Sequence, residues 1–235
     1  TAEEENFFGK HSGKEPHGDR WSKLVGEFDE VKYYGWEQVS SGYAAVWATE
    51  NSREAVFDAM RRKEVYATTG TRLRVRVFGG WDFAADEISR ADFADQGYRR
   101  GVPMGGDLWD APAGKAPSFM IRALRDPDGA NLDRVQIVKG WLDSQGETHE
   151  RIYDVAVSDG RTIGADGRCS EAVGSTVDIE NATFTNTIGD AVMAAHWVDP
   201  DFDPSEAAFY YVRVLEIPTP RWTTYDASFF GIDRP

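Results

Sequence analysis

The sequence has few of the residues that build disulfides and soft metal centres. Its 235 residues include one cysteine and four histidines. A single cysteine excludes an internal disulfide and any site that needs several cysteine ligands. The thiol, Cys169, stands in a glycine-containing stretch with no histidine beside it to lower its pKa. We therefore predict an unreactive thiol in an exposed loop.

Long apolar runs are also lacking, and positive charge is scarce. No run is long enough to span a bilayer, and residues 1–5 show neither an initiator Met nor the regions of a signal peptide. We therefore expect no membrane span, and we expect a natural N-terminal portion before Thr1. The 26 Lys and Arg face 40 Asp and Glu, which gives a net charge of −14. Because a field of this sign repels phosphate backbones, nucleic acid is not an expected partner.

Apolar and aromatic side chains are plentiful. Hydrophobic residues make up 41% of the sequence and aromatic residues 13%, with eight tryptophans. This content is too high for a disordered chain and predicts a folded core.

Residues 1–34 are polar and show neither a helical nor a strand period, so we expect an irregular segment there. Residues 43–48 form a short apolar run that predicts a buried strand. A helix is predicted over 52–63, because Asn51 or Ser52 can cap it and Glu54 falls in its first turn. The basic residues 61–63 close its last turn, where cations complement the helix dipole.

The period changes to two residues after the turn at 67–70, and the rest of the chain predicts a mainly β structure. Turn signals such as Asp126-Pro127-Asp128-Gly129 separate the apolar runs. No helical period intervenes, which favours two packed antiparallel layers. Two long connections, 82–115 and 160–189, are open to either a functional or a covering role. The predicted strands are 73–77, 119–124, 135–142, 152–157, 192–198 and 209–217.

The four histidines do not fall into a known metal-ligand spacing, and no nucleophile elbow or phosphate loop is present. His196 alternates with apolar residues on a predicted strand, so we interpret it as a hydrogen-bonded structural histidine. His149 adjoins a turn and is expected in solvent. His11 and His17 lie in a glycine-punctuated acidic segment, and His11 is the one candidate ligand among the four.

Several longer phrases carry a resemblance to a known family. Together they resemble the C-terminal half of a bacterial domain-of-unknown-function family that is similar to the PHP (polymerase and histidinol phosphatase) metallohydrolases. The likeness extends over essentially the whole chain. The phrases are residues 3–11 (EEENFFGKH), 40–48 (SSGYAAVWA), 53–60 (REAVFDAM), 65–70 (VYATTG), 78–83 (FGGWDF), 101–106 (GVPMGG), 131–141 (NLDRVQIVKGW) and 217–222 (IPTPRW).

The resemblance implies an α+β, mainly β fold in two parts. Residues 1–70 would supply the last elements of an incomplete PHP-like β/α barrel, with 43–48 as a final strand and 52–63 as a final helix. Residues 71–235 would form an antiparallel β-sandwich with long loops. Members of such a family look exported, which implies a periplasmic or secreted location.

The resemblance also implies a function, that of the C-terminal portion of a metal-dependent hydrolase acting on a phosphate or other ester of a small molecule. The main metal motifs would precede Thr1, so the missing N-terminal half is an expected partner. The full-length protein would bind zinc or manganese. The chain by itself is expected to bind no cofactor, to supply no catalytic residue and to be inactive. The site residues that this implies are His11 as a metal ligand, with Glu3, Glu4, Glu5, Thr68, Thr69 and Arg72 supporting the ligand or lining the pocket at the junction of the two parts.

A different class of function also fits the residues. The alternative is a non-catalytic binding or structural module of an exported protein, in which the sandwich docks a partner through exposed aromatic rings. Here Trp81, Trp109 and Trp222 are the candidates to dock a partner, a polysaccharide or an envelope component. A third alternative is a protein that has been cut, with its other half still attached to this one.

Overall fold

The protein is mainly β with a few short helices, as the sequence predicts. Its structure, a computed structural model, describes residues 22, 24–35 and 42–231. The elements, in chain order, are β1 (Leu24–Phe28), β2 (Val31–Tyr34), β3 (Tyr43–Val46), α1 (Arg53–Arg61), β4 (Val65–Thr68), β5 (Arg74–Gly80), the 3-10 helix η3 (Ala85–Ser89), α2 (Phe93–Arg100), β6 (Gly101–Pro103), β7 (Ser118–Leu124), β8 (Leu132–Leu142), β9 (Thr148–Val157), β10 (Val192–Val198), β11 (Ala207–Glu216) and α3 (Trp222–Phe230).

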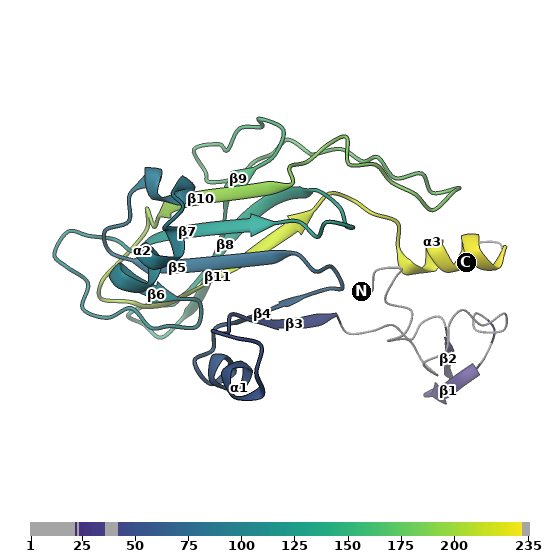
Figure 1. Ribbon diagram of the computed structural model, residues 1–235, viewed down its shortest axis with the longest axis horizontal. Coiled ribbons are helices and arrows are strands. Elements are labelled where there is room, and N and C mark those ends of the chain that lie inside the picture. The colour runs from purple at the N-terminus through teal and green to yellow at the C-terminus, as the bar shows by residue number, and fades with distance from the viewer. Residues whose placement is uncertain (1–21, 23, 36–41, 232–235) are drawn as a thin grey trace.

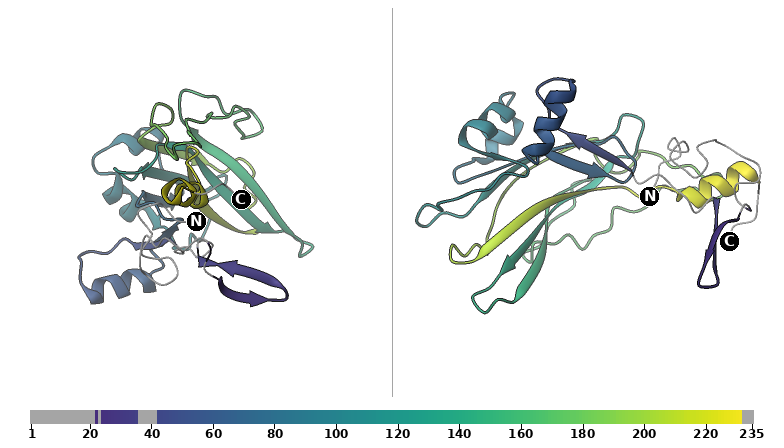
Figure 2. Two further views of the ribbon diagram at one scale, coloured as in Figure 1. Left: turned by 90° about the vertical axis from the view of Figure 1, so that its right-hand side faces the viewer. Right: turned by 90° about the horizontal axis from the view of Figure 1, so that it is seen from below.

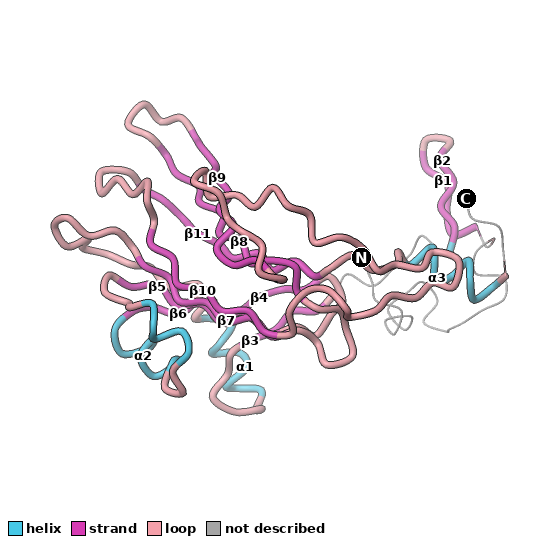
Figure 3. The backbone as a smooth tube through the Cα atoms, turned by 90° about the horizontal axis from the view of Figure 1, so that it is seen from above, coloured by secondary structure: helices cyan, strands magenta, loops and turns pink. Residues whose placement is uncertain are grey.

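Two antiparallel sheets form the body of the molecule (Figure 1). The four-stranded sheet has the order β10-β7-β5-β6 and the three-stranded sheet has the order β11-β8-β9. Seen from above, they lie as separate layers, with α2 on the outer side of the four-stranded sheet (Figure 3). Each strand that the sequence predicts beyond residue 72 is present within a few residues of its expected bounds.

One apolar core joins the facing sides of the two sheets. Alternation places every second residue of a strand on the same face, so each strand contributes a row of inward side chains. In β8, Val135 and Ile137 are fully buried, and in β7 Ile121 is fully buried. The members of this core are Leu73, Val75, Phe119, Ile121, Ala123, Leu132, Val135, Ile137, Met193 and Ala195.

The outer face of the four-stranded sheet has a core of its own. Phe78 and Met120 point outward from β5 and β7 and pack under Phe83 and Phe93. A Cβ at Gly97 would come within 2.3 Å of the Phe78 ring, so glycine lets α2 lie directly on the sheet. The connection expected over residues 82–115 therefore contains η3, α2 and β6, which cover this face.

Helix α1 begins where the sequence predicts. Ser52 is its N-cap, and its hydroxyl accepts a hydrogen bond from the Ala55 N–H at 3.3 Å. Glu54 stands in the first turn and Arg61 in the last, as the dipole favours. The helix ends at residue 61, two residues before the predicted bound, because Lys63 takes a left-handed conformation (φ 61°).

Strand β3 forms a small antiparallel sheet with β4, with Tyr43 opposite Thr68. Every strand pair within the described ranges is antiparallel, so no parallel pairing typical of a β/α barrel involves β3 there. Side chains dock this unit on β5: the Trp47 indole N–H donates to the Val75 carbonyl at 2.9 Å, and the Tyr66 hydroxyl donates to the Leu73 carbonyl at 3.2 Å.

Three expectations about regular structure and exposure were wrong. Residues 43–46 form the predicted strand, but it is not buried, and Tyr43 is 44% exposed. The segment predicted as irregular contains the β1–β2 hairpin over 24–34, which stands apart from the body (Figure 2). Its turn residues Asp29 and Glu30 both have positive φ, a conformation for which Asn-Gly is the usual sequence signal. Cys169 lies in a loop but is 7% exposed, because that loop folds against β9 and the Cys169 N–H donates to Asp154.

The structural roles of two histidines are as predicted. His196 is half-buried on β10, and its Nε2 lies 2.8 Å from the carbonyl oxygen of Phe83. His149 is exposed, stacks on Trp141 and lies 2.8 Å from Asp143. The sequence analysis did not identify Asp143 as the partner of His149, because the two residues lie on opposite sides of the β8–β9 turn.

The shared core predicts a large loss of stability when it is emptied. Ile121→Ala removes a fully buried side chain from β7, and we expect it to lower the free energy of unfolding by about 2–5 kcal/mol. Val192→Ala on β10, where the side chain is 59% exposed, is the matched control and should cost less than about 1 kcal/mol. Urea unfolding followed by fluorescence measures both. Equal effects would contradict the assignment of the core.

Candidate functional site

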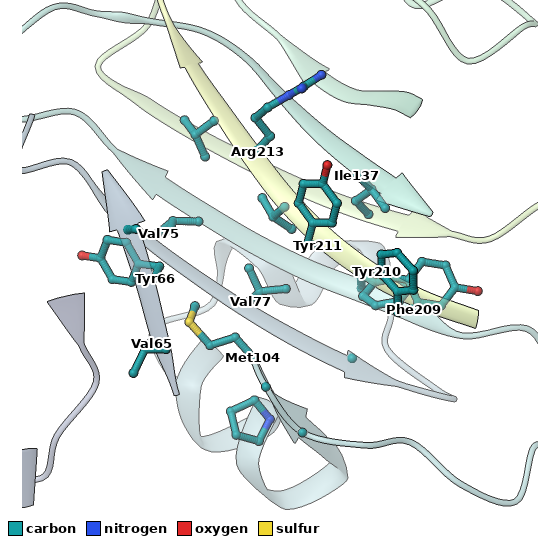
Figure 4. A pocket seen from close by; sticks show the side chains of 18 of the residues that line it. Val65, Tyr66, Val75, Val77, Met104, Ile137, Phe209, Tyr210, Tyr211 and Arg213 are labelled. Atoms are coloured by element: carbon teal, nitrogen blue, oxygen red, sulfur yellow. The ribbon is translucent and has the colours of Figure 1, made fainter. Parts of the chain in front are cut away.

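A groove of about 1510 Å³ opens between the two sheets along β11 (Figure 4). Strand β11 and the chain that follows it form one wall, and β4 with residues 102–111 forms the other. The floor is apolar and consists of residues that also belong to, or pack against, the shared core, among them Val75, Val77, Phe119 and Ile137. The groove is therefore an extension of the core that the protein leaves open.

The groove exists because, among the described residues, no strand bridges the two sheets at this side. Strand β6 pairs only with residues 78–80 of β5, so the first half of β5 has no strand neighbour there. The β3–β4 unit approaches that half through side chains and not through a strand ladder. Strand β11 is the edge of the other sheet. Two edges that do not pair leave a cleft between the layers.

The three tryptophans proposed as docking contacts all line this groove. Trp109 is 76% exposed, and its carbonyl accepts a hydrogen bond from the Trp81 indole N–H at 3.2 Å. Trp81 also packs on Phe202, with ring centroids 5.8 Å apart. Trp222 lines the groove from the start of α3. Residues far apart in the sequence thus gather as aromatic walls of one cleft.

The residues proposed at the junction separate into two groups. Thr68 and Thr69 line the groove. Arg72 instead forms ion pairs with Asp126 at 3.1 Å and with Asp128 at 2.9 Å. Burial alone would raise the pKa of Asp126, but the hydrogen bonds from the backbone and the guanidinium of Arg72 outweigh it and lower that pKa. Arg72 therefore stabilises the turn after β7 through its two ion pairs.

The remaining proposed site residues cannot be placed relative to the groove. His11, Glu3, Glu4 and Glu5, together with His17, lie outside the described residues. Within the described ranges, no group of three or more His, Cys, Asp or Glu side chains is arranged to hold a metal ion. The same ranges contain no helix that is both long and apolar enough to cross a membrane.

A buried polar cluster that sequence reasoning missed lies behind Tyr210, a residue of the groove wall. Lys139 on β8 is 3% exposed in its side chain, and its Nζ lies 2.7 Å from a carboxylate oxygen of Asp199. The Tyr210 hydroxyl donates to the same carboxylate at 2.6 Å. Burial, and then this hydrogen bond, raise the pKa of Tyr210, so the phenol stays neutral. The available signal was a lysine inside the apolar run 135–142.

A hydrogen bond links the two walls of the groove near the end of β11. The Thr71 hydroxyl donates to a carboxylate oxygen of Glu216 at 2.8 Å, which joins the β4–β5 turn to the end of β11. Thr71 is 3% exposed. This contact holds the two walls together beside the groove.

A positive charge in the wall comes from Arg213 on β11, which the sequence analysis did not select. Its Nε and Nη2 donate to Oε1 of Gln136 at 2.9 and 2.6 Å. The Gln136 amide nitrogen in turn donates to Asp154 at 2.6 Å. Arg134 and Arg168 both pair with that carboxylate, whose side chain is fully buried. A continuous polar chain therefore runs from the β9 edge to the groove.

Asp154 is the centre of this chain and is held ionised. Burial alone would raise the pKa of Asp154, but hydrogen bonds from the Cys169 N–H and Gln136, together with the charges of Arg168 and Arg134, lower it. A carboxylate with four such partners fixes the orientation of the amide of Gln136. Gln136 then presents its oxygen to Arg213.

With this geometry in place, the comparisons with known proteins give one result. A family model described as a protein of unknown function (DUF3604) matches residues 1–235. The chain belongs to this family. No curated protein matches it, and no solved structure matches it. The family description assigns no activity, so the groove is the guide to what this DUF3604 chain does.

The network around Asp154 predicts a pH-dependent stability. Because its folded pKa is below the unfolded value of about 3.9, Asp154 stabilises the fold above that value, and the contribution is lost as pH falls through the folded pKa. Asp154→Asn should lower the free energy of unfolding by about 3 kcal/mol at pH 7. The deficit should shrink below about pH 4.

Urea unfolding at several pH values measures this deficit, with Glu180→Gln, an exposed carboxylate on the 160–189 connection, as the control. The control should behave like the wild type at each pH. A deficit for Asp154→Asn that stays constant down to pH 2.5, or one no larger than that of the control, would show that this carboxylate is not the ionised centre of the network.

Proposed function

We propose that this DUF3604 chain is the C-terminal portion of a metal-dependent hydrolase and that its groove holds the substrate, a phosphate or other ester of a small molecule. The observation that carries the proposal is a groove with an apolar floor, aromatic walls, threonine hydroxyls and one fixed cation. Clefts that combine apolar lining with a few converging polar groups are the usual form of small-molecule sites. The likeness to PHP metallohydrolases is the support for a metal.

The contribution of the described residues is binding and not metal chemistry. They offer no cluster of ligands for a zinc or manganese ion, so the ion would be held by residues outside the described ranges. His11, with Glu3, Glu4 and Glu5, is the part of this chain that would approach it, and these residues lie outside the described ranges. Thr68 and Thr69 would line the pocket beside the substrate, and Arg213, at the rim on β11, would attract its negative charge.

The proposal extends to architecture and location. The two facing sheets would form the β-sandwich of residues 71–235, and β3, α1 and β4 would stand where a PHP-like barrel joins it. Such a protein would be periplasmic or secreted. Docking of β4 on β5 through Trp47 and Tyr66 would then hold the barrel end of the chain over one wall of the groove.

A second function is supported by the aromatic residues. Trp81, Trp109 and Trp222 lie around one cleft, an arrangement that also suits a non-catalytic module that binds a polysaccharide or an envelope component. In that case the same groove would bind its ligand without turnover. The two functions differ in whether a metal and hydrolysis accompany binding.

Elemental analysis and an activity assay on the whole polypeptide separate the two functions. We expect bound zinc or manganese in the purified protein and metal-dependent hydrolysis of 4-nitrophenyl phosphate or of 4-nitrophenyl carboxylate esters. Trp109→Ala should raise KM several-fold with a smaller change in kcat, because it removes binding that the ground state and the transition state share. Phe57→Ala on α1, away from the groove and 59% exposed, is the matched aromatic control.

The absence of both metal and ester hydrolysis would contradict the hydrolase function. A purified protein without metal that hydrolyses none of these esters after zinc or manganese is added would favour the binding module. An equal change in KM for Trp109→Ala and for Phe57→Ala would contradict the claim that the groove binds the substrate.

A further inference from the structure

Strand β11 carries three planar side chains in a row. Phe209, Tyr211 and Arg213 occupy alternate positions, so they lie on one face of the strand. The residues between them, Tyr210, Val212 and Val214, pack on the shared core. Figure 4 shows the three side chains following one another along β11. The row therefore faces away from the core, on the side of the sheet that the helices do not cover.

The two rings of the row are parallel and open to solvent. Their planes differ by 10° and their centroids are 6.5 Å apart. Phe209 is 62% exposed and Tyr211 is 46% exposed. The Phe209 ring has room to lie over β8 because its cross-strand neighbour is Gly140, where a Cβ would come within 2.4 Å of the ring. The sheet is thus shaped to hold these rings in place.

The third member of the row is a cation without a neutralising partner. Both hydrogen bonds that hold Arg213 go to the uncharged Gln136. Within the described part of the chain it forms no ion pair, although the sequence carries a net charge of −14. Its Nη1 donates to no described residue. A guanidinium fixed in this way presents free N–H groups to an anion.

We propose that this row is a binding site for an oligosaccharide that carries a carboxylate or a sulfate group. The apolar C–H faces of two consecutive sugar rings would stack on Phe209 and Tyr211, and the acidic group would pair with Arg213. A ligand with one ring would leave half of the aromatic row unused. Nucleic acid would also offer flat rings and an anion, but the net charge of −14 opposes every polyanion, so a short ligand with few acidic groups fits the row better.

The row lies on the outer face of β11 and borders the groove along that strand, so the inference rests on the proposed function and deepens it. It does not require ester hydrolysis, because stacking and charge pairing hold the sugar without a reaction. Binding without turnover would therefore defeat the hydrolase and leave this site intact. Turnover of aryl esters without sugar binding would support the hydrolase and contradict the sugar site.

Calorimetric titration of the whole polypeptide tests the site. The probes are trisaccharides of galacturonate and of glucuronate with their neutral methyl esters, and sulfated trisaccharides with their desulfated forms. We expect at least one acidic member to bind about tenfold or more tightly than its neutral counterpart. Arg213→Gln should abolish that preference and Arg213→Lys should keep part of it. Tyr211→Ala should weaken the acidic and the neutral form alike, by about tenfold.

Matched controls separate the site from general effects of charge and aromatic content. Arg99→Gln on α2 and Phe57→Ala on α1 remove an exposed cation and an exposed ring elsewhere, and neither should change binding. Unchanged urea midpoints show that each variant folds. Gly140→Ala displaces the Phe209 ring and should weaken binding without touching the charge.

Three results would overturn the proposal. The first is that no trisaccharide in the set binds the wild-type protein at millimolar concentration. The second is that the controls weaken binding as much as the substitutions in the row. The third is that oligodeoxythymidylate binds more tightly than every sugar, which would assign the row to nucleic acid.

Discussion

The apolar contact between the two sheets is the constraint around which the molecule is arranged. It is complete along one side, where β10 lies against both β8 and β9. On the other side, β11 and β5 carry apolar residues toward the same core but are not bridged by a further strand. Burial of apolar surface holds the layers together, and the unequal edges decide where the core stays open. The groove is the consequence of that asymmetry.

Two polar contacts along β11 brace the walls of this opening. Thr71 and Glu216 join the walls at one end of β11, and the pair of Lys139 with Asp199 lies behind Tyr210. Both contacts are largely buried, where a satisfied hydrogen-bonded pair rigidifies its surroundings. Arg213 is oriented between them through Gln136. A ligand would therefore meet side chains already held in place, which reduces the entropy lost on binding.

Local elements of this DUF3604 chain could be predicted where the signal is local. The Ser52 cap and the acidic first turn located α1, and alternation and apolar runs between turn signals located β5 and β7 to β11, but not β6. The prediction failed where partners are distant in sequence. Cys169 is buried because its loop folds onto Asp154, and the β1–β2 turn uses positive φ at residues that do not signal it. Of the candidate site, Trp81, Trp109, Thr68 and Thr69 were selected in advance, but nothing in the sequence placed them together.

The sequence by itself determined the mainly β character, the acidic charge and the positions of most strands along the chain. Periodicity, turn residues and composition act over short stretches of chain. Tertiary structure alone decided that β11 and β5 diverge, that Lys139 is buried against Asp199, and that Arg213 stands beside two parallel rings. These features depend on which strand edges meet and which stay free. That choice is made by the packing of whole sheets, and no short segment of the chain encodes it.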